Sequence, residues 1–155
     1  MPVTPFHLGP GVLLKAAAPH AVSLTAFAAA NVAVDLESVA NLLLGRHPVH
    51  AALHTLLGAL AVGALAGWAV SVVGRWWRWT SAEWQVRPAL AGGLLGGLGQ
   101  TALDAVMHAD LAPLAPVTDA NPLLGAVPLD ALHLACVAAG VLGLAGLWLR
   151  HWRMT

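Results

Sequence analysis

Four long apolar stretches constrain the fold of this chain more than any other feature. They cover residues 20–44, 49–74, 89–109 and 129–149, and a helix needs about 20 apolar residues to cross a bilayer. The composition agrees, because 59% of the residues are hydrophobic and only 9% are charged, whereas a soluble domain carries about 25% charged residues. The sequence therefore predicts an all-α integral membrane protein, a single domain over residues 1–155 built as a bundle of four transmembrane helices.

The segment before the first span, residues 1–19, holds four prolines and is not expected to cross the membrane. A short half-helix fits over residues 11–18. A second arrangement is a re-entrant half-helix over residues 9–15, which begins at the outer level of the membrane and turns back before it has crossed. Non-helical backbone at that depth is tolerated only where protein or water covers it. The two arrangements place His7 on opposite sides of the membrane, so its side stays open.

Positive charges divide unevenly between the two sides of such a bundle. With four spans, both termini and the loop between the second and third spans share one side. Arg46 is the single basic residue on the other side. The remaining lysines and arginines are Lys15, Arg75, Arg78, Arg87, Arg150 and Arg153. Since cytoplasmic segments carry the excess of positive charge, we expect a protein of the cell (inner) membrane with both termini in the cytoplasm.

Two histidines open the second apolar stretch. His50 and His54 are four residues apart, a spacing that places both side chains on one face of a helix, one turn above the other. Two imidazoles so placed can reach one metal ion. The pair alone is also compatible with two histidines that face water at the start of a helix.

Ionisable residues in the other spans fall at the same outer level as this pair. A charged residue within a span costs about 2.5–3.5 kcal/mol, and Arg46, in a loop, is the one basic residue near them. A bound divalent cation compensates such carboxylates; a His, Asp and Glu set suits zinc first, or manganese or iron. We therefore predict a metal site near the outer face. The residues at this level are Asp35, Glu37, Asp104, His108 and His133, the last either a ligand or an interfacial histidine.

The individual roles stay open at this point. Asp35 and Glu37 are two residues apart, so an ideal helix points them to different sides, one to the metal and the other to a supporting position. Asp104 either binds the metal or orients His108. Glu37 and His50 are the candidate catalytic residues, because either can act as general base if it is not a ligand.

Four short motifs follow one another along the chain: TPFHLGPG at residues 4–11, DLE at 35–37, HAALHT at 50–55 and LDAVMH at 103–108. With these motifs, nearly the whole chain resembles the YdjM-like family of membrane-bound, predicted metal-dependent hydrolases. That family is distantly similar to zinc-dependent phospholipase C and related phosphodiester-cleaving nucleases. The resemblance implies a helical bundle with His and Asp ligands for one or more zinc ions, and the hydrolysis of phosphoesters.

The resemblance also implies roles for particular residues. It favours the re-entrant placement of His7, and it extends a metal role to Glu37. The chain departs from the family pattern at Gln100, where a histidine is frequent, and at Glu37, where many relatives carry a second aspartate. These departures leave the number of metal ions open. The implied ligands are His7, Asp35, His54, Asp104 and His108.

The leading hypothesis is a membrane-embedded, metal-dependent hydrolase that acts on a phosphoester or lipid-linked substrate at the outer membrane–water interface. The alternatives are a haem-binding, electron-transfer membrane protein, with axial ligands among His54, His108 and His133, a structural metal site, or a transporter. Formal net charge is zero, which argues against a nucleic-acid partner. The expected partners are the lipid bilayer and a lipid-like substrate, and a homo-oligomer is compatible with the sequence.

Overall fold

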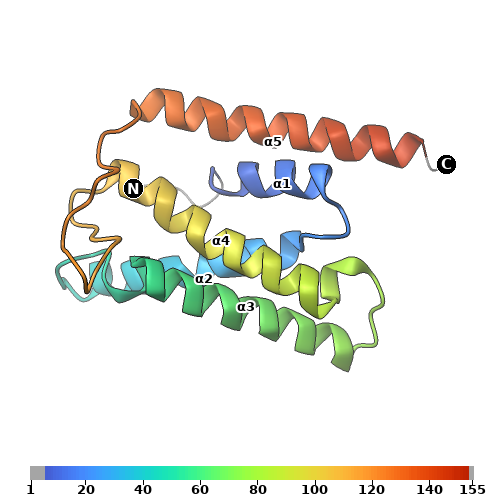
Figure 1. The fold of residues 1–155 in the computed structure, drawn as a ribbon, viewed down its shortest axis with the longest axis horizontal. Helices are drawn as coiled ribbons and strands as arrows, with labels where there is room; N and C mark the ends of the chain where they lie inside the picture. The colour runs from blue at the N-terminus through green and yellow to red at the C-terminus, as the bar shows by residue number, and fades with distance from the viewer. Residues whose placement is uncertain (1–5, 154–155) are drawn as a thin grey trace.

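The computed structural model describes residues 6–153, and the regular structure in that range is helical (Figure 1). Two short 3-10 turns, η1 (Ala52–His54) and η2 (Ala82–Trp84), precede the third and fourth helices. The four longer helices run along the long axis of the molecule, and successive ones point in opposite directions. The α-helices are α1 (Leu8–Ala17), α2 (Leu24–Leu43), α3 (Leu56–Trp76), α4 (Val86–Met107) and α5 (Leu129–Trp152).

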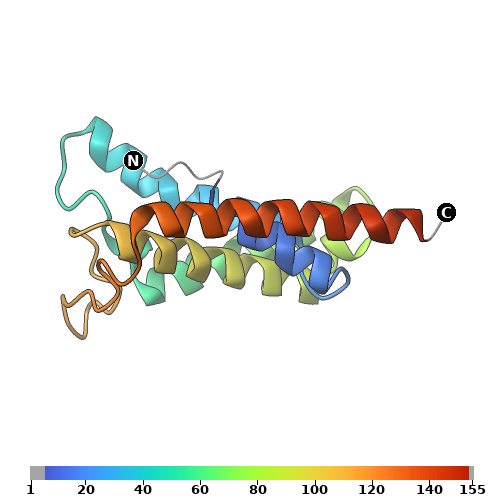
Figure 2. The same cartoon turned by 90° about the horizontal axis from the view of Figure 1, so that it is seen from above.

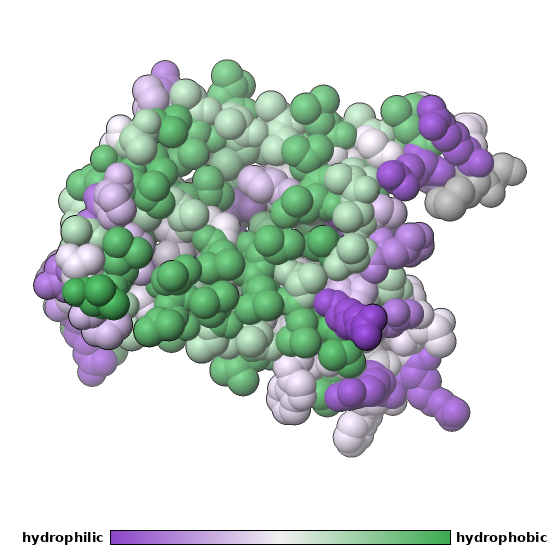
Figure 3. Space-filling model, viewed as in Figure 1, coloured by the Kyte–Doolittle hydropathy of each residue, from purple (hydrophilic) through white to green (hydrophobic). Residues whose placement is uncertain are grey.

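Among the described residues, three helices are long and apolar enough to cross a membrane: α2, α3 and α5. α1 is a shorter apolar helix. The prediction of an all-helical membrane protein is therefore supported, while a fourth crossing by α4 stays a prediction. α4 has 22 residues, but Gln100, Asp104 and its many glycines make it less apolar than the other three. Figure 3 shows a broad hydrophobic middle with hydrophilic residues gathered at the two ends.

Two of the helices begin later than the apolar pattern predicts, because a hydroxyl side chain caps each of them. The Ser23 side chain accepts a hydrogen bond from the Ala26 N–H at 3.1 Å, so α2 begins at Leu24 and not near residue 20. Thr55 accepts one from the Gly58 N–H at 3.0 Å, so α3 begins at Leu56 and not near residue 49. Serine and threonine are favoured at this position because they satisfy a free N–H of the first turn.

α4 lies at the centre of the bundle and uses glycines on two faces to approach its neighbours. On one face, Gly93 lies against the backbone of Gly63 in α3. On the other face, a Cβ at Gly96 would lie 2.5 Å from the Phe27 carbonyl oxygen in α2. Close backbone approach through small residues is the usual way in which membrane helices pack. The same close packing brings the polar residues of α2 and α4 together.

We expect Gly93→Ala to destabilise the protein by about 1–3 kcal/mol, the usual cost of overpacking. A Cβ at this position would overlap the Gly63 carbonyl oxygen, which belongs to a helix backbone that cannot easily move. Gly99→Ala is the matched control, because the nearest heavy atom to its Cβ is the Phe27 ring at 3.8 Å, and alanine favours the helix by up to about 1 kcal/mol. Thermal unfolding in mild detergent compares the two; equal stability of both variants would contradict the packing described here.

α1 is a half-helix that packs along α5 (Figures 1 and 2). Its ten residues span about 15 Å, half of a typical hydrocarbon core. His7, at its N-terminal end, lies next to Asp104 of α4. The C-terminal end of α1 lies toward the end of the bundle that carries the loop between α3 and α4 (Figure 1). The simple topology that puts His7 opposite the polar cluster is therefore wrong. A half-helix that starts at the level of the cluster is what the structure has, because the polar side chain of His7 finds its partners there.

The far end of α1 is held by an ion pair between Lys15 and Glu83 of η2. The Lys15 ammonium also donates to the carbonyls of Pro19 and Val22, at 2.7 and 2.9 Å. The second carboxylate oxygen of Glu83 accepts from the Ser23 hydroxyl and the Thr25 N–H, both at 3.1 Å. One acidic side chain thus joins α1, the start of α2 and the loop before α4.

The pKa of Glu83 sets the pH range in which this junction is stable. Burial raises its pKa, but the hydrogen bonds from Lys15 and the Thr25 N–H and the positive charge of Lys15 outweigh burial, so the pKa lies below the ordinary value of 4.5. A carboxyl with a lowered folded pKa stabilises the protein above its unfolded pKa, and that stabilisation is lost as pH falls through the folded pKa.

We expect Glu83→Gln to lower the free energy of unfolding by about 1–3 kcal/mol at neutral pH, because the partly buried Lys15 loses its counter-charge. The difference in the free energy of unfolding between wild type and Glu83→Gln narrows as pH falls through the folded pKa of Glu83. The wild-type carboxyl is then protonated and carries no charge, like the glutamine. Thermal unfolding of both proteins from neutral to acid pH measures this. A constant difference over that range would show that the charge of Glu83 is not responsible.

Candidate metal centre

The centre of the polar cluster is His54, which is fully buried at the end of η1. Its Nε2 lies 3.3 Å from Asp104 Oδ2 of α4 and 3.7 Å from Asp35 Oδ1 of α2. Asp104 is buried as completely as His54. Three segments far apart in the sequence therefore bring an imidazole and two carboxylates to one point inside the bundle.

Gln100 holds the carboxylates of this point in place. It lies one turn before Asp104 on α4 and is 1% exposed. Its Nε2 donates to Asp35 Oδ1 and to Asp104 Oδ2, the latter at 3.1 Å. Its Oε1 pairs with Nδ1 of His7, which leaves the His7 Nε2 directed at Asp104 Oδ1, 3.7 Å away. The amide thus supports one histidine and two carboxylates at once.

Three ligand-type atoms of the polar cluster lack hydrogen-bond partners among the described residues. His54 Nε2 and Asp104 Oδ1 are both buried without one, as is the Nε2 of the half-buried His108. Such groups cost roughly 1–3 kcal/mol each when they are left unsatisfied. Ligands held about 2.1 Å from one zinc ion at tetrahedral angles lie about 3.4 Å apart, close to the separations of 3.3 and 3.7 Å around His54 Nε2. The residues present therefore fit a divalent metal ion.

His50 joins the same group from the segment that leads into η1. Ligand atoms of His50, His54 and Asp104 all lie within 4.8 Å of one another. The ring of His50 meets the edge of His54, with centroids 4.8 Å apart, and stacks on His108 at 4.0 Å. A second group of similar size is formed by His50, His108 and Asp110. The prediction of a metal-binding cluster is thus supported for His50, His54 and Asp104, without any indication of which metal.

Asp110 fixes the orientation of His50. Its carboxylate accepts from His50 Nδ1 at 3.0 Å and from the backbone N–H groups of Val49 and His50 at 3.0 and 3.2 Å. Burial raises the pKa of Asp110, but these hydrogen bonds and the charge of His50 outweigh it and lower the pKa below its usual value. With Nδ1 engaged, Nε2 of His50 is the nitrogen left for a metal ion.

Glu37 and Ser38 support the turn that carries His54. The two carboxylate oxygens of Glu37 accept from the N–H groups of Ala52 and Leu53, at 3.1 and 2.7 Å. The nearer oxygen lies 3.9 Å from His54 Nδ1, and the Ser38 hydroxyl lies 3.4 Å from the same nitrogen. In this arrangement Glu37 holds the backbone around His54.

The two histidines of the centre have opposite electrostatic surroundings. His54 lies before the first residue of α3. Burial lowers the pKa of His54, but its hydrogen bonds and charge interactions with Asp104 and Asp35 outweigh burial and raise the pKa to about 9. The pKa of His108 is lowered, first by burial and then by the neighbouring His50. His54 therefore stands where the negative charge gathers, and a cation is attracted to the same place.

The structure corrects two predictions and adds one residue. His50 and His54 do not share a face of a helix, because the chain is irregular up to η1, yet their rings still meet. His108 is the residue after the last turn of α4 and not part of the helix. His133 stacks on Phe6 at 4.8 Å. The added residue is Asp110, which binds His50 and which is not among the site residues predicted from the sequence. The short spacing between His108 and Asp110 is the sequence signal that could have found it.

No protein-family model, no curated protein and no solved structure matches this chain.

Proposed function

We propose that this chain is a membrane-embedded, metal-dependent hydrolase. The observation that carries the proposal is the buried pair of His54 and Asp104, whose Nε2 and Oδ2 atoms lie 3.3 Å apart. In this pair His54 Nε2 and the other carboxylate oxygen, Asp104 Oδ1, have no hydrogen-bond partner. A purely structural polar core would satisfy such atoms internally. The resemblance of the short motifs to those of the YdjM-like family favours the same activity, and on that resemblance the substrate is a phosphoester.

In this proposal His54, Asp104 and His50 hold a divalent ion, zinc in the first place, with Asp35 and His7 beside them. Such an ion supplies Lewis acidity and lowers the pKa of a bound water to about 7. The chain's own residues do the rest: Gln100 and Asp110 orient the ligands, and Glu37 holds the turn of His54. Sites of this kind become catalytic when one coordination position stays open.

The location proposed for this centre is the outer side of the cell membrane. The segment between α2 and α3 and the segment after α4 cover the centre at one end of the bundle (Figure 1). The ends of α3 and α5 and the start of α4, which carry most of the basic residues, lie at the opposite end. By the positive-inside rule this opposite end is cytoplasmic. A centre level with the outer headgroups suits a lipid or lipid-linked phosphate ester.

The test is hydrolysis by protein purified in mild detergent and loaded with Zn²⁺, Mn²⁺ or Fe²⁺. We expect turnover of bis(p-nitrophenyl) phosphate or of a phospholipid by the loaded wild type and none by His54→Gln. Fully loaded protein that cleaves no phosphomonoester, phosphodiester or carboxylic ester would contradict the proposal and leave a structural metal site. Gly99→Ala, which lies outside the centre, is the control for handling in detergent.

A further inference from the structure

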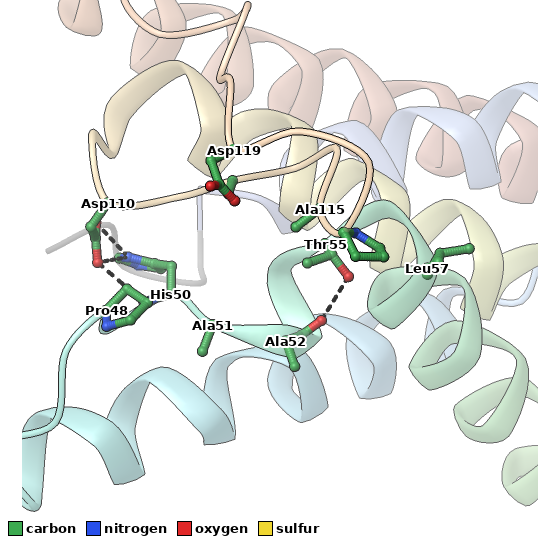
Figure 4. Close-up of a pocket in the computed structure, with 11 residues that line it drawn as sticks. Pro48, His50, Ala51, Ala52, Thr55, Leu57, Asp110, Ala115 and Asp119 are labelled. Atoms are coloured by element: carbon green, nitrogen blue, oxygen red, sulfur yellow. Dashed lines mark hydrogen bonds and ion pairs between the residues drawn. The ribbon is translucent and has the colours of Figure 1, made fainter.

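A pocket of about 400 Å³ opens next to His50 and Asp110 (Figure 4). One wall is the segment that leads into α3, and the other is the connection that follows α4. Small-molecule sites in proteins usually measure about 300–1,000 Å³, so the pocket suits a short alkyl chain or a single ring. Its apolar lining comes mainly from Ala51, Ala52, Leu57, Ala112, Ala115 and Pro116.

Most polar side chains of this pocket are already engaged within the protein. His50 and Asp110 bind each other, at 3.0 Å. The Thr55 hydroxyl donates to the Ala52 carbonyl at 2.8 Å and accepts from the Gly58 N–H at 3.0 Å. The exposed Asp119 carboxylate has no hydrogen-bond or ion-pair partner among residues 6–153. The pocket therefore offers an occupant apolar surface and negative charge, and its lining holds no lysine or arginine.

We propose that this pocket binds the apolar group next to the bond that is hydrolysed, in an anionic ester whose charged centre lies at the metal centre. The inference rests on the proposed function and names its substrate class. His50 belongs to both the pocket and the metal centre, since it lines the pocket and its ligand atom lies within 4.8 Å of those of His54 and Asp104. Asp110 and Asp119 repel a second negative charge, so the pocket takes the uncharged arm of such an ester.

The test uses Co²⁺-loaded protein in mild detergent, titrated with methyl-, ethyl-, propyl- and butylphosphonate. The visible spectrum of Co²⁺ reports binding without any turnover. We expect the affinity to rise about two- to fourfold with each methylene, the gain for burying a CH₂ group. In Ala115→Trp the indole fills the pocket, so methylphosphonate binds as before and the gain with chain length disappears. Ala126→Trp changes an exposed residue of the same connection and is the control, in which the affinity still rises with chain length.

A second comparison tests the negative charge. We expect 3-phosphonopropionate to bind wild type at least tenfold more weakly than propylphosphonate, and Asp119→Asn to narrow that gap. Equal affinities for all four alkylphosphonates in wild type, each with a spectral response, would overturn the pocket assignment and leave the metal centre intact. Failure of the protein to bind Co²⁺, or a bound Co²⁺ whose spectrum responds to no phosphonate, would overturn the proposed function and the pocket with it.

Discussion

Replacing Asp104 with asparagine is expected to abolish stabilisation of this protein by divalent metal ions. Asp104 is fully buried, its Oδ2 lies 3.3 Å from His54 Nε2, and its Oδ1 lacks a hydrogen-bond partner. A ligand at 100 to 1,000 times its dissociation constant stabilises a folded protein by about 3–4 kcal/mol. Wild type should gain that much from Zn²⁺, and Asp104→Asn should gain almost nothing.

Without a metal ion, we expect the order of stability of wild type and Asp104→Asn to be reversed. In the metal-free wild type, the carboxylates of Asp104 and Asp35 share the single positive charge of His54, so one buried negative charge stays uncompensated, which is costly. Asparagine removes that charge, has almost the same shape and keeps an oxygen that Gln100 can donate to. We therefore expect metal-free Asp104→Asn to be at least as stable as metal-free wild type. Thermal unfolding of both proteins, with Zn²⁺ and with a chelator, separates the two effects. Equal stabilisation of both proteins by Zn²⁺ would exclude Asp104 as a ligand.

Replacing Asp110 with asparagine is expected to weaken metal binding about 10- to 100-fold, the usual effect of losing a carboxylate that orients a histidine ligand. The carboxylate accepts a hydrogen bond from His50 Nδ1. An asparagine can turn its amide N–H toward that nitrogen, which favours the proton on His50 Nε2 and removes the nitrogen available to a metal ion. The oxygen of the amide can still accept from the backbone of Val49, so the fold should survive.

Two measurements separate this role from a merely structural one. Nitrogen NMR of the imidazoles reports which ring nitrogen of His50 carries the proton, and we expect it to move from Nδ1 to Nε2 in Asp110→Asn. His50→Gln should reduce metal affinity as much as the double variant, because Asp110 acts through His50. Additive losses in affinity, or an unchanged tautomer, would show that Asp110 does not orient His50.

The helical, membrane-type fold is readable from the sequence because hydropathy alone carries it, as α2, α3 and α5 illustrate. The starts of α2 and α3 are set by Ser23 and Thr55. These caps are short-range signals that a long apolar stretch conceals, so its predicted start falls several residues too early. The central place of α4 depends on glycine contacts with two other helices, which hydropathy does not report.

The sequence predicts that the candidate site residues lie at one level along the helices, but it does not predict which side chains contact one another. His54, Asp104 and Asp35 meet, as predicted from their shared level along the bundle. The support given by Asp110 to His50 depends on how two irregular segments fold over the end of the bundle, and no helical period describes them. The position of His7 likewise follows from the length of α1, which is hard to predict because the helix begins with Gly9, Pro10 and Gly11.

The most direct test of the account is elemental analysis of wild-type protein extracted in mild detergent, beside His54→Ala and Asp104→Ala. We predict close to one or more equivalents of zinc, manganese or iron per wild-type chain, and a loss of that metal in both variants. Wild-type protein that holds no metal, even after reconstitution with each of these ions, would contradict the metal centre and the hydrolase built on it.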